Sequence, residues 1–176
     1  MNPGKAKKKK WPVVAALMVI LLAAAILFLP FPVKIQRQLT GVAFSGEPGE
    51  EMEPCEVAIE GTEYCYLLKP DVFDGTFALS VDPRTTERGA HLNAGIAGET
   101  VSFLTYTYAD ETGGPGIAHV GYFLSDSDLN WVYVRTKDAQ GNIRDIAAPA
   151  QGREEALAVR EKAASRTPGK VLPEYS

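Results

Sequence analysis

Cysteine, histidine and N-terminal acidic residues are all scarce in this chain of 176 residues. Two cysteines cannot build a disulfide-rich scaffold, and the two histidines, His91 and His119, lack the spacing of a zinc motif. No Asp or Glu precedes Glu47, whereas five of the 18 Lys and Arg residues lie in the first ten positions. With 45% hydrophobic and 23% charged residues, the composition excludes wholesale disorder and indicates one folded domain plus extra segments.

Catalytic and nucleotide-binding motifs are lacking as well. The chain has no G-x-S-x-G nucleophile elbow, no G-x-x-x-x-G-K-[ST] phosphate loop and no G-x-G-x-x-G helix start. Residues 126–130 (DSDLN) imitate the start of a calcium loop, but Trp131 and Lys137 occupy the positions that require Gly and Glu. We therefore predict a turn capped by aspartates there, and no catalytic residue, metal ligand or cofactor anywhere.

The longest apolar run predicts a transmembrane helix. Residues 13–29 are 17 consecutive apolar residues, and no charge occurs over residues 11–33. About 20 such residues cross a hydrocarbon core of ~30 Å. Because lysines crowd residues 1–10, the positive-inside bias keeps that tail in the cytoplasm. The prediction is a single-pass protein of the cell membrane, with residues 34–176 extracytoplasmic.

A cleaved signal peptide is the alternative interpretation of this run. The run exceeds the 7–15 apolar residues of such a peptide, and the only A-x-A-like site, at 23–25, is followed by apolar rather than polar residues. An uncleaved anchor with the lipid bilayer as partner is therefore favoured. Next to a membrane span, the lysines at 7–10 orient the chain rather than bind nucleic acid.

Beyond the span the chain is acidic. It carries 22 acids and 13 bases after residue 33, a net charge of 13 − 22 = −9, and residues 47–82 contain ten acids against Lys69 alone. Such a stretch is usually a solvated face, and less often a surface for a cation or a basic partner. In either case binding to nucleic acid is disfavoured.

Most of residues 34–150 has the pattern of short β-strands separated by turn residues. With no βαβ pattern, the predicted fold class is an all-β ectodomain, an antiparallel small sandwich or barrel-like meander of seven to nine strands. Residues 82–98 read as a loop with at most a short strand. The predicted strands are 33–44 with a break or bulge at Gly41, 55–60, 64–68 after a Gly-Thr turn, 76–81 after an Asp-Gly turn, 100–108, 117–124, 131–136 and 143–147.

A short C-terminal helix follows the strands. Within the segment 151–166, residues 153–164 place Glu154 and Glu155 in the first turn and Lys162 near the last, as the helix dipole favours. The apolar face of this helix is thin, so we expect it to pack on the edge or end of the sheet. Residues 167–176 are predicted to be a flexible tail.

Three stretches carry a resemblance to a known group of proteins. They are CEVAIEGT at 55–62, DVFDGTFALSV at 71–81 and APAQGREEA at 148–156. Together with the Lys-rich start and a span ending in LPFPVK, they resemble uncharacterised small single-pass, membrane-anchored envelope proteins of Gram-positive bacteria. The resemblance implies a membrane-anchored extracytoplasmic β domain, and it supplies no activity and no functional residues.

The two cysteines are a disulfide candidate whose pairing depends on a hairpin register. A three-residue loop with Gly61 in the left-handed region places Cys55 opposite Cys65, within bonding reach. A two-residue loop instead pairs Ile59 with Tyr64, matches the apolar faces better and separates the cysteines. Both registers stay open at this point, and the disulfide is favoured because two free thiols are uncommon outside the cell.

Four aromatic side chains are candidates for a binding face. Tyr106 and Tyr108 share one face of a predicted strand, and Trp131 and Tyr133 share one face of another. An aromatic face on a β domain can bind a glycan or a peptide, although such residues are more often core.

The function most consistent with this pattern is a non-enzymatic binding or interaction role in the cell envelope, with an envelope protein or a glycan as partner. One alternative is an extracytoplasmic carboxylate-dependent hydrolase, which two carboxylates ~5–9 Å apart in a pocket would favour. Another is an accessory subunit of a membrane complex that acts through its helix.

Overall fold

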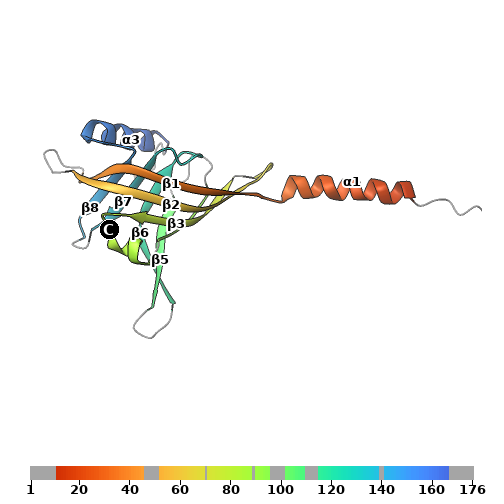
Figure 1. Ribbon diagram of the computed structural model, residues 1–176, viewed down its shortest axis with the longest axis horizontal. Coiled ribbons are helices and arrows are strands. Elements are labelled where there is room, and N and C mark those ends of the chain that lie inside the picture. Colours follow the sequence, from red (N-terminus) through yellow and green to blue (C-terminus); the bar gives the residue numbers. More distant parts are fainter. Residues whose placement is uncertain are drawn as a thin grey trace, which may run out of the picture.

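The computed structural model describes residues 11–45, 52–69, 71–88, 90–95, 102–109, 115–138 and 141–166. The described part contains three helices and eight strands (Figure 1). In chain order they are α1 (Trp11–Phe28), β1 (Phe31–Phe44), β2 (Glu53–Cys65), β3 (Val72–Leu79), α2 (Pro83–Arg88), β4 (Ala90–Gly95), β5 (Ser102–Ala109), β6 (Pro115–Ser125), β7 (Val132–Lys137), β8 (Ile143–Ala148) and α3 (Arg153–Ser165).

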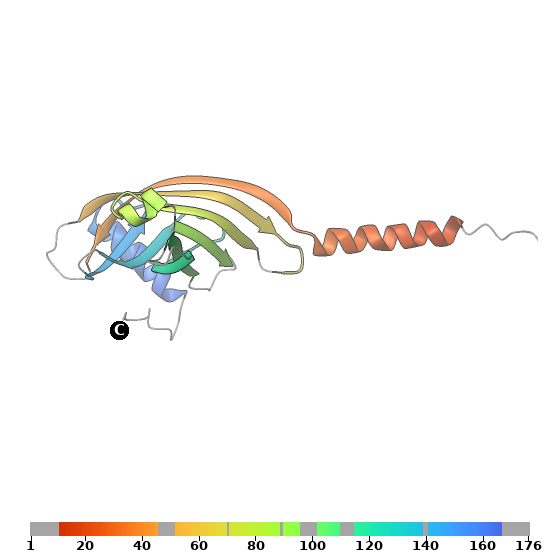
Figure 2. The same cartoon turned by 90° about the horizontal axis from the view of Figure 1, so that it is seen from below.

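The eight strands form one closed antiparallel barrel. Each strand pairs with the next along the chain, and β1 also pairs with β8, which closes the sheet. The curved sheet and its closure are visible from two directions (Figures 1 and 2). The predicted antiparallel meander is therefore confirmed in its barrel form, since a single closed sheet is not a sandwich. A closed barrel leaves no unpaired sheet edge along its seam.

β2 is one long strand, and the turn predicted at 59–62 was wrong. The strand runs without interruption from Glu53 to Cys65, and Gly61 lies opposite Gly75 of β3. A Cβ built on Gly61 would lie 2.6 Å from the Gly75 Cα and 2.7 Å from the ring of Phe73. The glycines are present because strands and ring approach each other closely, not because the chain turns. For the same reason the Asp-Gly turn predicted at 74–75 was wrong.

Residues 82–98 were predicted as a loop with at most a short strand, and the described residues among them, 82–88 and 90–95, include a short helix as well as a strand. Asp82 caps the short helix α2: its carboxylate accepts the backbone N–H of Arg84 at 3.1 Å. Its carbonyl accepts the N–H of Thr85 at 3.0 Å. β4 follows and pairs with β3 and β5. Likewise, β1 passes through Gly41 without the predicted break.

The barrel interior is filled by apolar side chains. Inward-facing positions of successive strands, such as Val57, Phe77, Val134 and Ile146, are buried in one cluster. The rings of Phe77 and Phe123 meet edge to face, 5.4 Å apart. Eight strands enclose an interior that such side chains can fill, so the core of the fold lies inside the barrel.

The predicted C-terminal helix is confirmed as α3, but it lies across the outer face of the barrel rather than at an edge. It packs on β7 and β8, with Ala156 and Ala163 buried against them (Figure 1). Small side chains on its buried face let the helix backbone approach the sheet closely.

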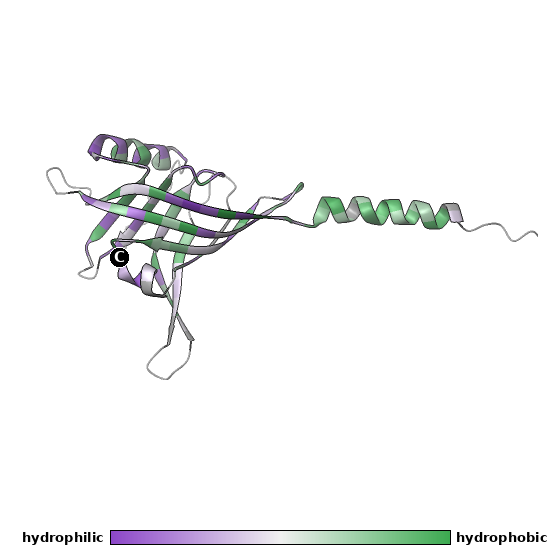
Figure 3. Cartoon of the chain, in the orientation of Figure 1, coloured by the Kyte–Doolittle hydropathy of each residue, from purple (hydrophilic) through white to green (hydrophobic). Residues whose placement is uncertain are grey.

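α1 extends away from the barrel and is apolar along its length (Figures 2 and 3). Its described large apolar side chains are 41–78% exposed, so the barrel does not bury them. Leu29 and Pro30 alone connect it to β1. In the described part of the chain, no helix has both the length and the hydropathy needed to span a membrane.

Candidate functional site

The two cysteines lie in the same strand and form no disulfide. Both are free thiols, Cys55 buried and Cys65 half-buried. Because β2 is continuous, ten strand residues of about 3.3 Å each separate them by roughly 33 Å. The predicted hairpin disulfide was therefore wrong. Cys55 faces the barrel interior, and Cys65 lies near the end closest to α1, opposite Phe31.

The four candidate aromatics do not form a common exposed face. Trp131 and Tyr133 are only 3% and 0% exposed, because they lie in the cluster that α3 covers. Tyr106 packs against the barrel interior. The side chain of Tyr108 is outside the described residues.

One end of the barrel, which we call the α1-side mouth, has a cavity of about 490 Å³. It exists because β1 extends past β8: β8 pairs only with residues 42–44 of β1, whereas β2 pairs with β1 as far as Phe31. The loop between β6 and β7 closes one side. The lining residues are Val33, Lys34, Ile35, Gln36, Arg37, Glu63, Asp128 and Asn130.

The predicted aspartate-capped turn is confirmed in that loop. The Asp126 carboxylate accepts the backbone N–H of Asn130 at 2.7 Å, and Leu129 adopts a positive φ of 54° with its side chain fully buried. The buried leucine anchors the loop, and Asp128 and Asn130 consequently line the cavity.

Acidic side chains converge at one corner of the α1-side mouth. Burial, followed by the charges of Asp71 and Asp128, raises the pKa of Glu63 above its ordinary value of 4.5. Burial and the charges of Glu63 and Asp71 likewise raise the pKa of the Cys65 thiol. Like charges held together in this way raise the free energy of the site until a proton or a cation neutralises one of them.

Glu63, Cys65 and Asp71 are also the one group among the described residues whose side chains could hold a metal ion. Their donor atoms all lie within 4.8 Å of one another. One Asp71 oxygen already accepts the N–H of Tyr66 at 2.8 Å. A thiolate with two carboxylates would suit a borderline-soft ion such as Zn²⁺.

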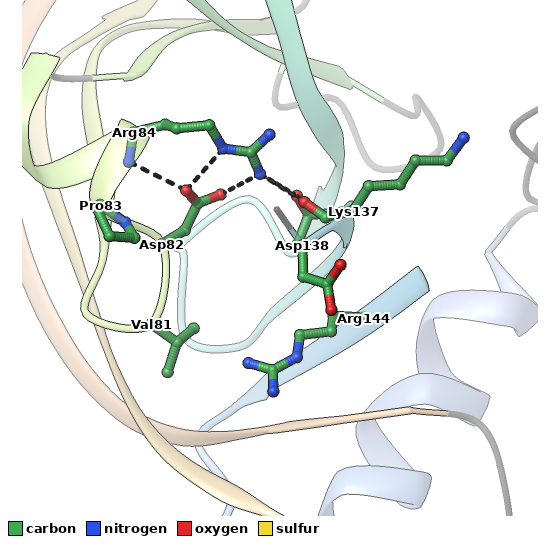
Figure 4. A pocket seen from close by; sticks show the side chains of 8 residues that line it. Val81, Asp82, Pro83, Arg84, Lys137, Asp138 and Arg144 are labelled. Carbon is green, nitrogen blue, oxygen red and sulfur yellow. Dashed lines mark hydrogen bonds and ion pairs between the residues drawn. The ribbon is translucent and has the colours of Figure 1, made fainter. Parts of the chain in front are cut away.

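A second cavity, of about 390 Å³, lies beside α2 and the ends of β7 and β8 (Figure 4). Arg84 binds both oxygens of Asp82, at 2.9 and 2.7 Å, and donates to the carbonyl of Lys137 (Figure 4). Arg144 is paired with Glu53 at 2.7 Å. These bonds connect α2 to β7, and β8 to β2, so we interpret this cavity as structural.

A buried ion pair lies beneath α3. Arg135 of β7 and Asp145 of β8 are directly opposite each other, with their side chains only 14% and 1% exposed and an N–O distance of 2.8 Å. The hydrogen bond from Arg135 to this carboxylate raises the pKa of the guanidinium. Arg160 of α3 lies 3.9 Å from the same carboxylate, and Lys162 lies over the Trp131 ring at 5.0 Å. The cluster fixes the helix to the barrel.

Sequence reasoning did not select the residues of the α1-side mouth, although one signal pointed toward them. The acidic excess of residues 47–82 includes Glu63 and Asp71. Alternation along an uninterrupted β2 would also have placed Glu63 on the same face as Cys65. The turn assigned to Gly61 broke that alternation. Lys34 and Arg37 join the site through the pairing of β1 with β2, and Asp128 joins it only through the closure of the barrel.

Comparison with family models, with curated proteins and with solved structures finds no match to this chain.

Proposed function

We propose that this chain is a single-pass membrane protein that holds its β-barrel outside the cytoplasm, and that the barrel has a non-enzymatic binding role through the α1-side mouth. The observation that carries the proposal is the position of α1. An exposed apolar helix continues directly into β1, at the end of the barrel that carries the mouth.

The membrane anchor is supported by the surface of α1. A helix that is apolar on every face belongs in a protein core or in lipid, and the barrel does not bury this one. Its 18 residues measure about 27 Å at 1.5 Å per residue, slightly less than a hydrocarbon core of ~30 Å. The uncharged chain continues from the end of α1 as far as Val33, and these residues supply the remaining length needed to cross the core.

A binding role at the mouth is supported by the contrast between the two ends of the barrel. Near α2, the charged side chains are engaged with one another and join structural elements. At the α1-side mouth, burial and the charges of Asp71 and Asp128 oppose the ionisation of Glu63. The interior is filled with side chains, so a ligand or partner would bind at the rim.

The anchor is tested by placing charges in the middle of α1. The double substitution Val19→Lys with Ile20→Lys should release the chain from membranes that resist carbonate extraction, since each lysine costs about 2.5–3.5 kcal/mol at the centre of a span. The control is Ile143→Lys, an exposed position on β8. Retention of the double variant in the membrane would contradict the anchor.

Orientation is tested with an impermeant thiol reagent on intact protoplasts. A cysteine at the exposed position 117 (Ile117→Cys) should be labelled above the wild-type background before lysis. Labelling that requires lysis would place the barrel inside the cell and contradict the proposal.

The binding role is tested by site-specific photocrosslinking in cells. A benzophenone amino acid at Asn130, which lines the mouth, should give a discrete adduct. The same group at Gln151, an exposed position outside the mouth, should not. Equal adducts at both positions, or none at Asn130, would contradict a role for the mouth.

One observation favours a carboxylate-dependent hydrolase as a second candidate. Glu63 and Asp128 line the same cavity, and the pKa of Glu63 is raised, as the acid of a two-carboxylate mechanism requires. Under this alternative, Glu63→Gln would abolish turnover of a glycan substrate but leave the crosslinking at position 130 intact. If the barrel has only a binding role, the wild-type full-length protein would not turn over a glycan, and Glu63→Gln would have no effect on turnover.

A further inference from the structure

Exposed apolar side chains gather beside the C-terminal end of α1. Beyond α1, nine large apolar side chains are exposed within the described residues. Five of them belong to the two short segments 29–33 and 67–68, and the other four are spread over β5, β6, β8 and α3. We call Phe31, Val33, Leu67 and Leu68 the apolar tip.

The two segments of the apolar tip are adjacent because of the strand register. Phe31 at the start of β1 lies opposite Cys65 at the end of β2, so the connection from β2 to β3 starts beside it. This connection reaches toward α1 in both views, and its end is hydrophobic (Figures 1, 2 and 3). Phe31 and Val33 are 50% and 47% exposed, and Leu67 and Leu68 are 59% and 62% exposed.

The link to α1 restricts how far the apolar tip can lie from a membrane that holds α1. Only Leu29 and Pro30 separate Phe28, the last residue of α1, from Phe31. Three extended steps of about 3.3 Å span at most roughly 10 Å. If α1 spans the bilayer, the apolar tip must therefore lie at the headgroup layer.

Charges around the apolar tip suit that location. Lys34 follows Val33, and Lys69 follows Leu68 with its ammonium group 5.7 Å from the centre of the Tyr66 ring. An apolar surface with lysines at its border and an aromatic ring is the pattern of an interfacial segment. The acids of this region, Glu63 and Asp71, are clustered with Cys65.

We infer that the apolar tip inserts into the outer leaflet, with Lys34 and Lys69 against lipid phosphates. This inference rests on the proposed anchor, and it goes further by assigning a second membrane contact. Because α1 and the apolar tip both contact the membrane, the barrel cannot rotate about the link at residues 29–30, and the α1-side mouth stays next to the bilayer. A ligand would reach the mouth along the membrane surface.

The experiment places a tryptophan at the apolar tip of the full-length chain. Leu68→Trp is reconstituted in vesicles of phosphatidylcholine and phosphatidylglycerol whose acyl chains are brominated near the headgroup. The matched control is Ile117→Trp, which replaces a side chain of similar exposure, 69%, on β6. Wild-type protein, with Trp11 and Trp131, supplies the baseline, and flotation with the vesicles reports the anchor separately.

We expect the emission of the tryptophan introduced at position 68 to shift to shorter wavelength and to lose at least half its intensity in brominated vesicles, with less than a tenth lost at position 117. Flotation without quenching at position 68 would overturn the tip contact and leave the anchor intact. Failure to float would overturn both. Equal quenching at the two positions would also overturn the inference, because it would show that no particular face of the barrel meets the membrane.

Because positions 67 and 68 are exposed, substitutions there should not prevent folding. In a second measurement, Lys34→Gln with Lys69→Gln is combined with Leu68→Trp. Quenching should fall severalfold in vesicles containing phosphatidylglycerol and change little in phosphatidylcholine alone. Unchanged quenching in both vesicle types would contradict the role assigned to the lysines.

Discussion

Single residues of β2 differ in what surrounds them, and the two cysteines show this most directly. Cys55 faces the apolar interior and Cys65 lies beside Glu63 and Asp71, although the two cysteines are on the same face of one strand. Alternation predicts the face on which a side chain lies. It does not predict how far along the barrel that side chain sits, or whether the interior is filled there.

Thiol labelling tests this difference. In the folded chain a maleimide should modify Cys65 slowly, since its pKa is raised, and should leave the buried Cys55 unmodified until the protein unfolds. Prior reduction should change nothing, because no disulfide is present. Peptide mass spectrometry distinguishes the two sites. Labelling that appears only after reduction would contradict the strand assignment.

The raised pKa of Glu63 makes stability depend on pH. Burial and neighbouring acids raise the pKa of Glu63 in the folded state. Ionisation of Glu63 therefore destabilises the fold as the pH rises above 4.5, the ordinary pKa of a glutamate. Glu63→Gln should therefore raise Tm at pH 7 and leave it unchanged at about pH 3.5, where the carboxyl is protonated in both states. Differential scanning calorimetry provides the measurement.

Glu60→Gln is the matched control, because Glu60 is exposed on the other face of the same strand. At each of the two pH values, the Tm of Glu60→Gln should equal that of the wild-type protein. A lower Tm for Glu63→Gln at pH 7 would show that the charge of Glu63 stabilises the fold, and would contradict the prediction.

Among the elements, α3 lies over a buried charge that helps to fix its position. Asp145→Ala would remove the carboxylate that pairs with the mostly buried Arg135, which should cost about 3–5 kcal/mol of unfolding free energy. The matched control, Glu53→Ala, breaks the exposed pair with Arg144 and should cost about 1 kcal/mol or less. Urea unfolding followed by tryptophan fluorescence compares them. Equal losses would refute the structural role given to the buried pair.

Elements were predictable where local pattern and tertiary environment agree. The β-branched and aromatic content of residues 100–108, the turn residues before 131–136 and the terminal charges of α3 led to strands and a helix close to those observed. β2 and β3 were predicted poorly, because Gly61 and Gly75 resemble turn residues in sequence. Each of these glycines lies against the other across the sheet, and a local pattern does not show this contact between two strands.

For the molecule as a whole, closure depends on a short seam. β1 and β8 pair over only three positions, residues 42–44 with 145–147. A Cβ on Gly41 would collide with the carbonyl of Ala147 and lie 2.7 Å from the Ala148 Cβ. Gly41→Val should therefore force the strands apart and cost about 3 kcal/mol or more, at or above the upper range for overpacking.

Hydrogen exchange locates the effect of that substitution. Amides of β1 and β8 should exchange faster in Gly41→Val than in wild type, with a smaller change in β4 and β5, which lie farthest from the seam in the closed strand order. The control is Gly152→Ala, where a Cβ meets no atom within 4 Å. Unchanged exchange along the seam would show that closure does not depend on this contact.

Several features of this protein followed from residue order alone: an apolar helix at the N-terminus, an antiparallel meander of about eight strands and a final amphipathic helix. They follow because hydrophobic periodicity, charge placement and run length act over neighbouring residues. The α1-side mouth, the free cysteines and the apolar tip were decided by the tertiary structure. Each depends on how strands pair, and the mouth also depends on the closure of the sheet. Cross-strand register and the close glycine contacts set this pairing, and local sequence cannot reveal them.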